Sequence, residues 1–253
     1  MFASERLEEI VKILNREGKV VVKELSQLFN VTEDCIRKDL KNLENQKLIK
    51  RTYGGAVLLR STAREEKIEN RKERDLEAKR IIAEKAFGLI EENETIFLDI
   101  STINILLSEI IAKSSKRLTV ITNMLDIVKS FSNNNTCKVI CTGGVFNKEL
   151  DGFIGAAAIE SISKYKVSKA FIGSCGIDIY DGSITTFDVE DGNTKKAIMQ
   201  SSRKVFLVME NKKFYIDGTY KFAHLQDVNS VITEERPNDN LLEILASNDT
   251  SVI

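Results

Sequence analysis

The sequence has little of what a metalloprotein or a membrane protein needs. Its 253 residues include a single histidine, His224, and no two cysteines in a CxxC spacing. Zinc and haem sites are built from clusters of His and Cys, so the sequence argues against either. No apolar run approaches the roughly 18 residues that span a bilayer, and the acidic, helical start is unlike a signal peptide. We therefore expect a cytoplasmic protein with no metal, no other cofactor and no membrane partner.

Charge is unevenly distributed, although the net charge is only −1. Residues 1–60 carry 12 Lys and Arg against 9 Asp and Glu, whereas residues 61–253 carry 25 against 29. Within residues 37–60 the balance is 7 against 2. A localised basic patch on an otherwise slightly acidic chain is typical of a surface that binds a polyanion. A chain of this length also favours two domains over one.

Apolar spacing predicts three short helices in the first sixty residues. A first helix is expected over 4–17, and Gly18 follows at the position where helices end in a left-handed residue. A second, short helix should end at Asn30, which tolerates a positive φ. Thr32 is a suitable N-cap for a third helix. The inward stripe of that helix is Ile36, Leu40 and Leu43.

Basic residues lie on the other side of the third helix and in the segment after it. Two strand-like runs, 48–51 and 56–59, flank a Gly-Gly pair, which predicts a basic hairpin with a Gly-Gly turn. Three helices and a hairpin are the parts of a winged helix-turn-helix, whose third helix enters the major groove. The charge run alone also fits an ordinary solvated helix face. The residues expected to bind DNA are Thr32, Arg37, Lys38, Lys41, Arg51, Tyr53, Gly54 and Gly55.

The stretch "GKVVVKELSQLFNVTEDCIRKDLKNLENQKLIKRTYGGAV" closely resembles the N-terminal motif of the DeoR family of bacterial transcriptional regulators. Members carry a Val-x-x-x-x-Ile-Arg-Arg-Asp-Leu-type recognition helix and a basic wing that ends in Gly-Gly-Ala. Here Cys35 replaces a usual Thr, and Lys38 replaces the second Arg, so a point charge stands in place of a bidentate fork. The resemblance implies double-stranded operator DNA as a partner. A homo-oligomer, dimer or tetramer, is the expected form.

Beyond this motif the pattern changes to strands alternating with helices. Residues 60–75 are dense in alternating charge and contain neither Gly nor Pro, which predicts an exposed helical linker between domains 1–59 and 76–253. The alternation predicts a mainly parallel sheet covered on both faces. The expected fold is thus a small α+β winged helix-turn-helix domain followed by a larger α/β domain. Its expected strands are 95–98, 118–121, 138–141, 169–173, 204–209 and 230–233.

Polar residues and glycines follow four of these strands. Parallel sheets bind ligands beyond the carboxyl ends of their strands, and helix N-termini there offer N–H donors to an anion. Each loop alone also fits ordinary turn chemistry, but four at one edge favour a small phosphorylated ligand. The residues expected to bind this effector are Asp99, Ser101, Thr102, Thr122, Asn123, Gly143, Gly144, Asp178, Lys195 and Lys213.

The same loops resemble the C-terminal sensor domain of the DeoR family, for example in "VICTGGVFNKEL" and "KAFIGSCGIDIYDGSITT". The resemblance implies a fold similar to ribose-5-phosphate isomerase and a phosphorylated sugar or related metabolite as effector. Members usually have an Asp-Ser-Gly-Thr-Thr loop, whereas this chain has Asp99-Ile100-Ser101-Thr102-Ile103. That loop should cradle phosphate less well. We expect the phosphate to bind to the Gly143-Gly144 loop and to Lys195 or Lys213.

Two classes of function fit this organisation. The first is a DNA-binding transcriptional regulator, usually a repressor in this family, of a sugar or carbohydrate operon. The second is a sugar-phosphate isomerase with an accessory DNA-binding module. Isomerisation needs a carboxylate base and a polarising cation, but "GIDIYDG" offers Asp178 alone where a carboxylate cluster is expected. The sequence therefore predicts a regulator without catalytic residues.

Overall fold

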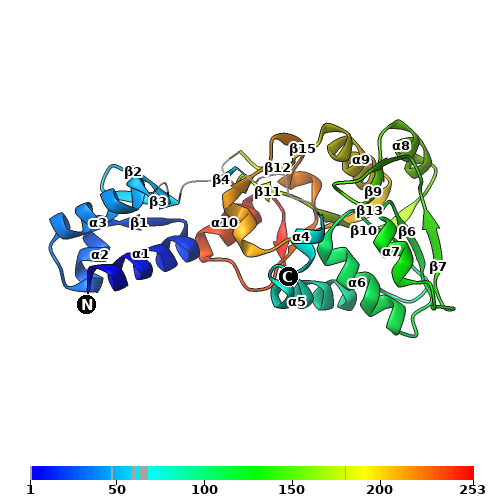
Figure 1. Ribbon diagram of the computed structural model, residues 1–253, viewed down its shortest axis with the longest axis horizontal. Helices are drawn as coiled ribbons and strands as arrows, with labels where there is room; N and C mark the ends of the chain where they lie inside the picture. The colour runs from blue at the N-terminus through cyan, green and yellow to red at the C-terminus, as the bar shows by residue number, and fades with distance from the viewer. Residues whose placement is uncertain (1, 47, 59–60, 63–67, 180) are drawn as a thin grey trace. The chain divides into compact units, whose positions relative to one another are not determined.

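The computed structural model describes the chain except residues 1, 47, 59–60, 63–67 and 180 (Figure 1). The chain divides into two compact units. The first comprises Met1–Ser61 and Pro237–Leu241, and the second comprises Thr62–Arg236 and Leu242–Ile253. Within the described residues, no helix is long and apolar enough to cross a membrane.

The described part of the first unit contains the predicted helices and hairpin. A third strand joins the hairpin, and the antiparallel order is β1-β3-β2. The buried side chains of α3 pack with those of α1 in one apolar core, which includes Ile10, Leu14, Ile36 and Leu40. The elements are α1 (Ala3–Glu17), β1 (Lys19–Val21), α2 (Val22–Phe29), α3 (Glu33–Asn45), β2 (Ile49–Thr52) and β3 (Gly55–Leu58).

The predicted helix ends are confirmed. Gly18 is left-handed, with a φ of 72°, and its N–H donates to the carbonyl oxygen of Leu14 at 2.7 Å. Asn30 is left-handed as well, with a φ of 53°. The hydroxyl of Thr32 accepts a hydrogen bond from the backbone N–H of Cys35 at 3.3 Å, as an N-cap should.

The turn of the hairpin differs from the prediction. Thr52 pairs with Gly55, so Tyr53 and Gly54 alone form the turn, and Gly54 has a φ of 83°. Gly55 is the first residue of β3 rather than a turn residue. A Cβ there would lie 2.0 Å from the carbonyl oxygen of Val20, because β1 runs alongside. The prediction of a Gly-Gly turn was therefore wrong. Gly55 is required instead because the backbone of β1 approaches it too closely for a side chain.

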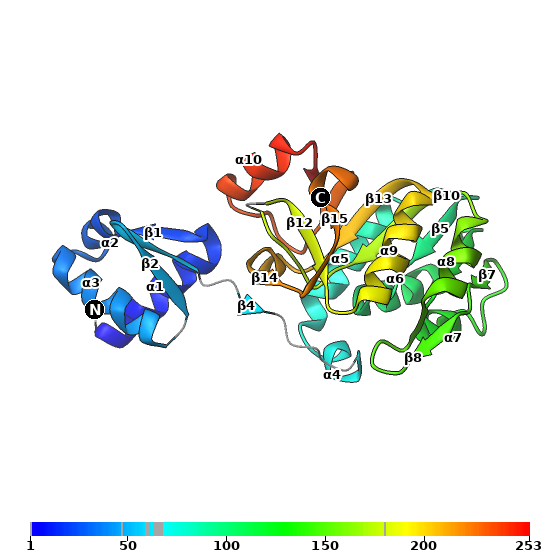
Figure 2. The same ribbon diagram turned by 90° about the horizontal axis from the view of Figure 1, so that it is seen from above.

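The second unit is built on a seven-stranded sheet in which all neighbours are parallel (Figure 2). The strand order is β17-β16-β13-β10-β5-β6-β7. The six expected strands all occur, with ends within two residues of those predicted. Their bounds are β5 (Thr95–Leu98), β6 (Thr119–Thr122), β7 (Lys138–Cys141), β10 (Val167–Gly173), β13 (Ser202–Val208) and β16 (Ser230–Ile232), and the edge strand is β17 (Ser251–Val252).

Helices cover both faces of this sheet, as predicted. Helices α5, α6 and α7 lie on one face, and their apolar side chains share a buried cluster with Leu98, Val120 and Phe171 of the sheet. Helices α8 and α9 lie on the opposite face (Figures 1 and 2). The helices are α5 (Leu76–Gly88), α6 (Thr102–Lys113) and α7 (Leu125–Ser130), then α8 (Ala156–Ser163) and α9 (Val189–Gln200).

Several smaller elements were not predicted. A three-stranded antiparallel sheet has the order β11-β12-β15, and a two-stranded hairpin joins β8 to β9. These elements are β8 (Val145–Asn147), β9 (Gly152–Ile154), β11 (Gly176–Ile177), β12 (Ser183–Thr186), β14 (Ile216–Asp217), β15 (Tyr220–His224), α10 (Asp239–Ser247) and the 3₁₀ turns η1 (Asn211–Tyr215) and η2 (Leu225–Asp227).

The segment expected to be one exposed helical linker is different where the structure describes it. It contains β4 (Ser61–Thr62) and the short helix α4 (Ile68–Lys72). Ile68 is fully buried in the main core, so α4 docks rather than standing in solvent. The Nζ of Lys79 donates to the carbonyl oxygens of Arg71 and Arg74 and so caps the end of α4. Lys72 also pairs with Asp126, and the backbone N–H of Ile68 donates to the carbonyl oxygen of Glu149 at 3.2 Å, so one apolar side chain, an ion pair and a backbone bond hold α4 in place.

Candidate DNA-binding surface and effector cavity

The third helix separates its residues into two faces. Its apolar stripe is buried in the core of the first unit, whereas Arg37, Lys38 and Lys41 are exposed. The structure thus brings the three predicted cations together on one solvent-facing side of α3. This is the geometry that a helix needs to enter a major groove with basic side chains forward.

Acidic residues of the same helix hold Arg37. Its Nη2 lies 2.6 Å from Glu33 Oε2, and its Nη1 lies 2.8 Å from Asp34 Oδ1. The Arg37 side chain is still 55% exposed. Exposed pairs of this kind contribute only about 0.3–0.5 kcal/mol each. Arg37 can therefore leave both carboxylates for a base edge or phosphate at small cost.

The hairpin presents Arg51 and Tyr53 beside α3. The backbone N–H and the Nε of Arg51 donate to the Glu44 carboxylate at 3.0 and 2.7 Å, which ties the hairpin to α3 and lowers the pKa of Glu44. Tyr53, in the turn, is fully exposed. The positive φ of Gly54 lets the turn stay tight.

A buried ion pair behind α3 was missed from the sequence. Arg6 of α1 donates from Nε to Asp39 Oδ2 at 2.6 Å and from Nη2 to Oδ1 at 3.2 Å. Both side chains are less than a tenth exposed, and the bond to Asp39 raises the pKa of Arg6. The Sγ of Cys35 accepts a further bond from Arg6 at 3.2 Å. The sequence signal for this pair was the position of Asp39, an acidic residue directly before the inward-facing Leu40.

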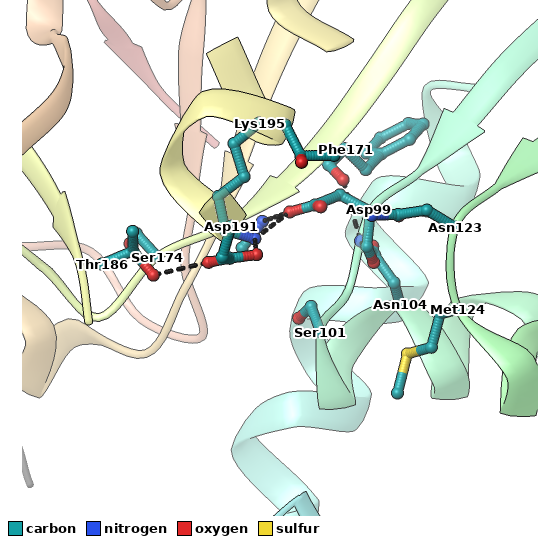
Figure 3. A network of polar contacts seen from close by, with 12 residues as sticks. Asp99, Ser101, Asn104, Asn123, Met124, Phe171, Ser174, Thr186, Asp191 and Lys195 are labelled. Carbon is teal, nitrogen blue, oxygen red and sulfur yellow. Dashed lines mark hydrogen bonds and ion pairs between the residues drawn. The ribbon is translucent and has the colours of Figure 1, made fainter. Parts of the chain in front are cut away.

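In the second unit, a buried charge network stands at the carboxyl ends of β5 and β10 (Figure 3). Lys195 Nζ lies 2.6 Å from Asp99 Oδ2 and 3.3 Å from Asp191 Oδ1. The backbone N–H of Gly173 also donates to Asp99 Oδ2, at 3.0 Å. Thr186 Oγ1 donates to the other oxygen of Asp191 at 2.6 Å. All three charged side chains are nearly or fully buried.

Two carboxylates share one ammonium in this network, so it buries one net negative charge. Burial raises the pKa of Asp99 to about 6, and Asp191 adds to the effect, although Lys195 opposes it. Burial lowers the pKa of Lys195, but the two carboxylates outweigh it and raise the value to about 12. Lys195 is therefore a compensated cation and is not free to neutralise an anionic ligand.

A small cavity of about 40 Å³ adjoins the network. Ser101 and Thr102 line it at the start of α6, and Lys195 lines it from α9. Asp99 lies behind them, outside the described lining. Charged and hydroxyl side chains also line it, among them Arg71, Glu149, Ser174, Thr186, Asp188, Asp191 and Lys213.

Two cations besides Lys195 face this cavity. Lys213 Nζ donates to the carbonyl oxygen of Ser174 at 2.8 Å and lies 3.6 Å from Glu210 Oε2, and burial lowers the pKa of Lys213. The Nε of Arg71 is buried and has no hydrogen-bond partner among the described residues. Arg71 comes from α4, so the segment that follows the first unit contributes a donor to the cavity.

Other predicted residues are not brought to the cavity. Thr122 Oγ1 donates to the carbonyl oxygen of Leu98 at 2.7 Å, and Asn123 Nδ2 donates to that of Phe153 at 3.1 Å, so both tie strands and loops together. Gly143, Gly144 and Asp178 are outside the described lining. A Cβ on Gly144 would lie 2.9 Å from the Cβ of Ala158, so packing against α8 accounts for it. The geometry thus does not support the expectation that a phosphate leans on Gly143-Gly144.

Sequence reasoning also missed residues that the structure does bring here. Asp191 stands four positions before Lys195, so the two share a helix face, and this spacing was readable. Arg71 was not, because its place depends on the docking of α4 through Ile68.

Comparisons with known proteins agree on one family. Residues 6–62 match the DeoR-like helix-turn-helix domain, and residues 74–235 match the DeoR C-terminal sensor domain. The glycerol-3-phosphate regulon repressor of Escherichia coli (strain K12) is 31% identical over 97% of this chain and 96% of that protein. The lactose phosphotransferase system repressor of Staphylococcus epidermidis (strain ATCC 35984) is 31% identical over 91% of each chain.

Among solved structures, ribose 5 phosphate isomerase A from Neisseria gonorrhoeae aligns with a TM-score of 0.39 and 16% identity. The alignment covers 53% of this chain and 52% of that one. The two domain matches and the full-length relatives are sufficient by themselves: the chain belongs to the DeoR family of helix-turn-helix transcriptional regulators.

Proposed function

We propose that this protein represses an operon for sugar or carbohydrate metabolism, and that a phosphorylated sugar or related metabolite controls its binding to operator DNA. The exposed cationic face of α3, beside the hairpin, supports the proposal that the protein binds DNA. Two relatives are named as repressors of the glycerol-3-phosphate regulon and of the lactose phosphotransferase system, which supports this class of operon and effector.

The DNA-binding residues have separate tasks in this proposal. Arg37 reads a base edge in the major groove, where an arginine fork matches guanine. Lys38 and Lys41 contact phosphates as point charges, and Thr32 positions the first turn of α3. The hairpin lies along the sugar-phosphate chain through Arg51 and Tyr53, and the bare backbone of Gly54 allows close approach.

The effector's phosphate binds to Arg71 and Lys213 rather than to Lys195. The network of Asp99, Asp191 and Lys195 has one net negative charge, so it repels a phosphate. Arg71 Nε has no partner among the described residues and gains one in the complex. The N-terminus of α6 at Thr102 adds backbone donors on the same cavity. The cavity must open for a sugar phosphate, since about 40 Å³ is less than such a ligand needs.

We propose a regulator rather than an enzyme because the lining carboxylates are occupied or exposed. Asp191 is bonded to Thr186 and Lys195, and Asp188 accepts the N–H of Asp191 at 2.8 Å as the cap of α9. Glu149 is open to solvent. An isomerase needs a carboxylate poised over the substrate. A homo-oligomer in the bacterial cytoplasm, where operator DNA lies, completes the proposal.

Arg37→Ala should weaken operator binding by about 1–3 kcal/mol, or roughly 5- to 150-fold, because a bidentate base contact is lost. Arg51→Ala should instead weaken all DNA sequences alike and reduce the salt dependence. Gel-shift titrations at several salt concentrations, with operator selected from random DNA, measure both effects. Lys12→Ala, an exposed cation of α1, is the control and should bind like wild type. Wild-type operator affinity in Arg37→Ala would contradict the assignment of α3 as the recognition helix.

Lys213→Ala should lower the affinity for a phosphorylated sugar by roughly 10- to 100-fold, because charge-assisted hydrogen bonds contribute about 1.5–3 kcal/mol. Arg71→Met should have a similar effect, since it keeps the length of the side chain and removes the donors. Calorimetric titration with glycerol 3-phosphate and hexose phosphates measures the affinities. Lys164→Ala, at an exposed cation that follows the last residue of α8, is the matched control. Unchanged affinity in both cavity variants would place the phosphate elsewhere.

A further inference from the structure

A second cavity, of about 530 Å³, lies over the small antiparallel sheet of the second unit. It shares no described lining residue with the effector cavity. Its size is within the roughly 300–1,000 Å³ of small-molecule pockets. Strand β12, helix α9, strand β15 and the turn η2 all contribute side chains, among them Ser183, Lys196, Met199, Phe222, His224 and Asp227.

Two polar atoms of this lining have no partner in the described structure. Ser183 is only 5% exposed, and its Oγ has no hydrogen bond of normal geometry, although the hydroxyl lies near enough to the Asp181 carboxylate to help lower the pKa of Asp181. The Nδ1 of His224 is buried and has none either. Ser183 and His224 stand directly opposite each other in the β12–β15 pair, so both side chains project from the same face of the sheet. A buried polar group without a partner is costly, and a ligand that supplies the missing bonds removes that cost.

The imidazole of His224 is fixed in one orientation. Its Nε2 lies 2.8 Å from the carbonyl oxygen of Asp181, which can only accept. Nε2 therefore carries the proton, and in the neutral ring Nδ1 presents a lone pair. The ring packs so closely on Gly182 that a Cβ there would lie 2.3 Å from Nε2. The site thus offers an acceptor at Nδ1 and a hydroxyl at Ser183 in set positions.

Charge and packing identify the class of ligand. Lys196 and Lys221 are balanced by Asp181 and Asp227 in the lining, and Lys221 is bonded to Asp181. Apart from the imidazole, the charges of the described lining cancel, so they do not attract a phosphate. Phe222 and Met199 supply an apolar floor. An apolar floor with paired donors and acceptors suits the carbon skeleton and hydroxyl groups of a sugar or polyol.

We propose that this cavity binds an uncharged polyhydroxy compound, a free sugar or a polyol, as a second ligand distinct from the phosphorylated effector. Once the lining side chains that cover these two atoms move aside, one ligand hydroxyl donates to His224 Nδ1, another exchanges hydrogen bonds with Ser183 Oγ, and the carbon skeleton packs on Phe222. The helix α9 supplies Lys195 to the effector cavity and Lys196 to this one. The strand β12 likewise supplies Thr186 to the first and Ser183 to the second.

The single histidine makes the test specific. In the full-length protein with isotope-labelled histidine, the imidazole resonance reports on this cavity alone. We expect at least one member of a panel of glucose, galactose, ribose, mannitol and glycerol to shift it saturably, and inorganic phosphate not to. Ser183→Ala should weaken that ligand roughly 3- to 10-fold by loss of one hydrogen bond. Ser163→Ala, an exposed serine of α8, is the control and should leave its affinity unchanged.

Three results would overturn the proposal. The first is that no neutral compound of the panel shifts the resonance. The second is that inorganic phosphate shifts it saturably in place of the neutral compounds. The third is a shift that depends on protein concentration without added ligand, which would mean that a second copy of the chain covers the cavity. A thermal melt of Ser183→Ala verifies that the variant is folded, as expected for removal of an unpartnered hydroxyl.

Discussion

Lys195→Met is expected to destabilise the second unit by about 3–5 kcal/mol, because breaking a buried ion pair leaves the opposite charge uncompensated. Lys195 is the ammonium shared by Asp99 and Asp191, which are 0% and 2% exposed. Asp99 Oδ1 has no hydrogen-bond partner among the described residues, so without Lys195 the backbone N–H of Gly173 is the remaining described donor to this carboxylate. Unfolding in urea, followed by circular dichroism, gives the free energy. The absence of tryptophan rules out its fluorescence as the probe.

The next residue provides the control for this prediction. Lys196 has the same side chain on the same helix but is exposed, so Lys196→Met should change stability by no more than about 0.5 kcal/mol. Adding Asp99→Asn to Lys195→Met should recover part of the loss, because one of the two uncompensated carboxylates is then neutral. Equal stability of the two lysine variants would show that the network does not hold the strand ends together. The two units can unfold in separate transitions, which must be fitted separately.

The main sheet could be predicted closely because each strand is a short apolar run between turn residues. β5 and β7 begin and end at the expected residues, and the parallel arrangement follows from the alternation with helices. The small sheet escaped prediction because β11 has only two residues and β12, with the sequence SITT, has one apolar residue in four and so lacks an apolar run. The pairing of Ser183 with His224 also depends on a register shift between Ile184 and Thr185, which no local pattern announces.

The candidate site was only partly predictable, for a related reason. The sequence predicted Asp99 at the end of the strand 95–98 and named Lys195 as a ligand, but the bond between them joins residues 96 positions apart. The sequence therefore suggested Lys195 as a free phosphate ligand, whereas the fold gives it two carboxylate partners. Charge counted along a chain does not show which charges are already compensated. For the same reason, the sequence did not predict the bond between Arg6 and Asp39, which are 33 positions apart.

Arg6→Met should unfold much of the first unit and abolish operator binding while leaving effector binding intact. The variant leaves the Asp39 carboxylate, 8% exposed, without its guanidinium between α1 and α3. Such a loss costs about 3–5 kcal/mol. A unit of about 60 residues has only roughly 3–9 kcal/mol of stability in total. Helix α3 would therefore lose the support that holds the proposed DNA contacts Arg37, Lys38 and Lys41 in place.

A double variant separates this effect from a general loss of folding. Arg6→Met with Asp39→Leu replaces the pair by apolar side chains of similar size, and such replacements are often neutral or stabilising, so stability and operator binding should return. Lys12→Met, on the exposed face of α1, should match wild type throughout. Circular dichroism melts give stability, gel shifts give operator affinity, and calorimetry with the phosphorylated sugar gives effector affinity. If Arg6→Met binds operator like wild type, the ion pair does not support the recognition helix. If it loses effector affinity as well, the two units do not fold independently.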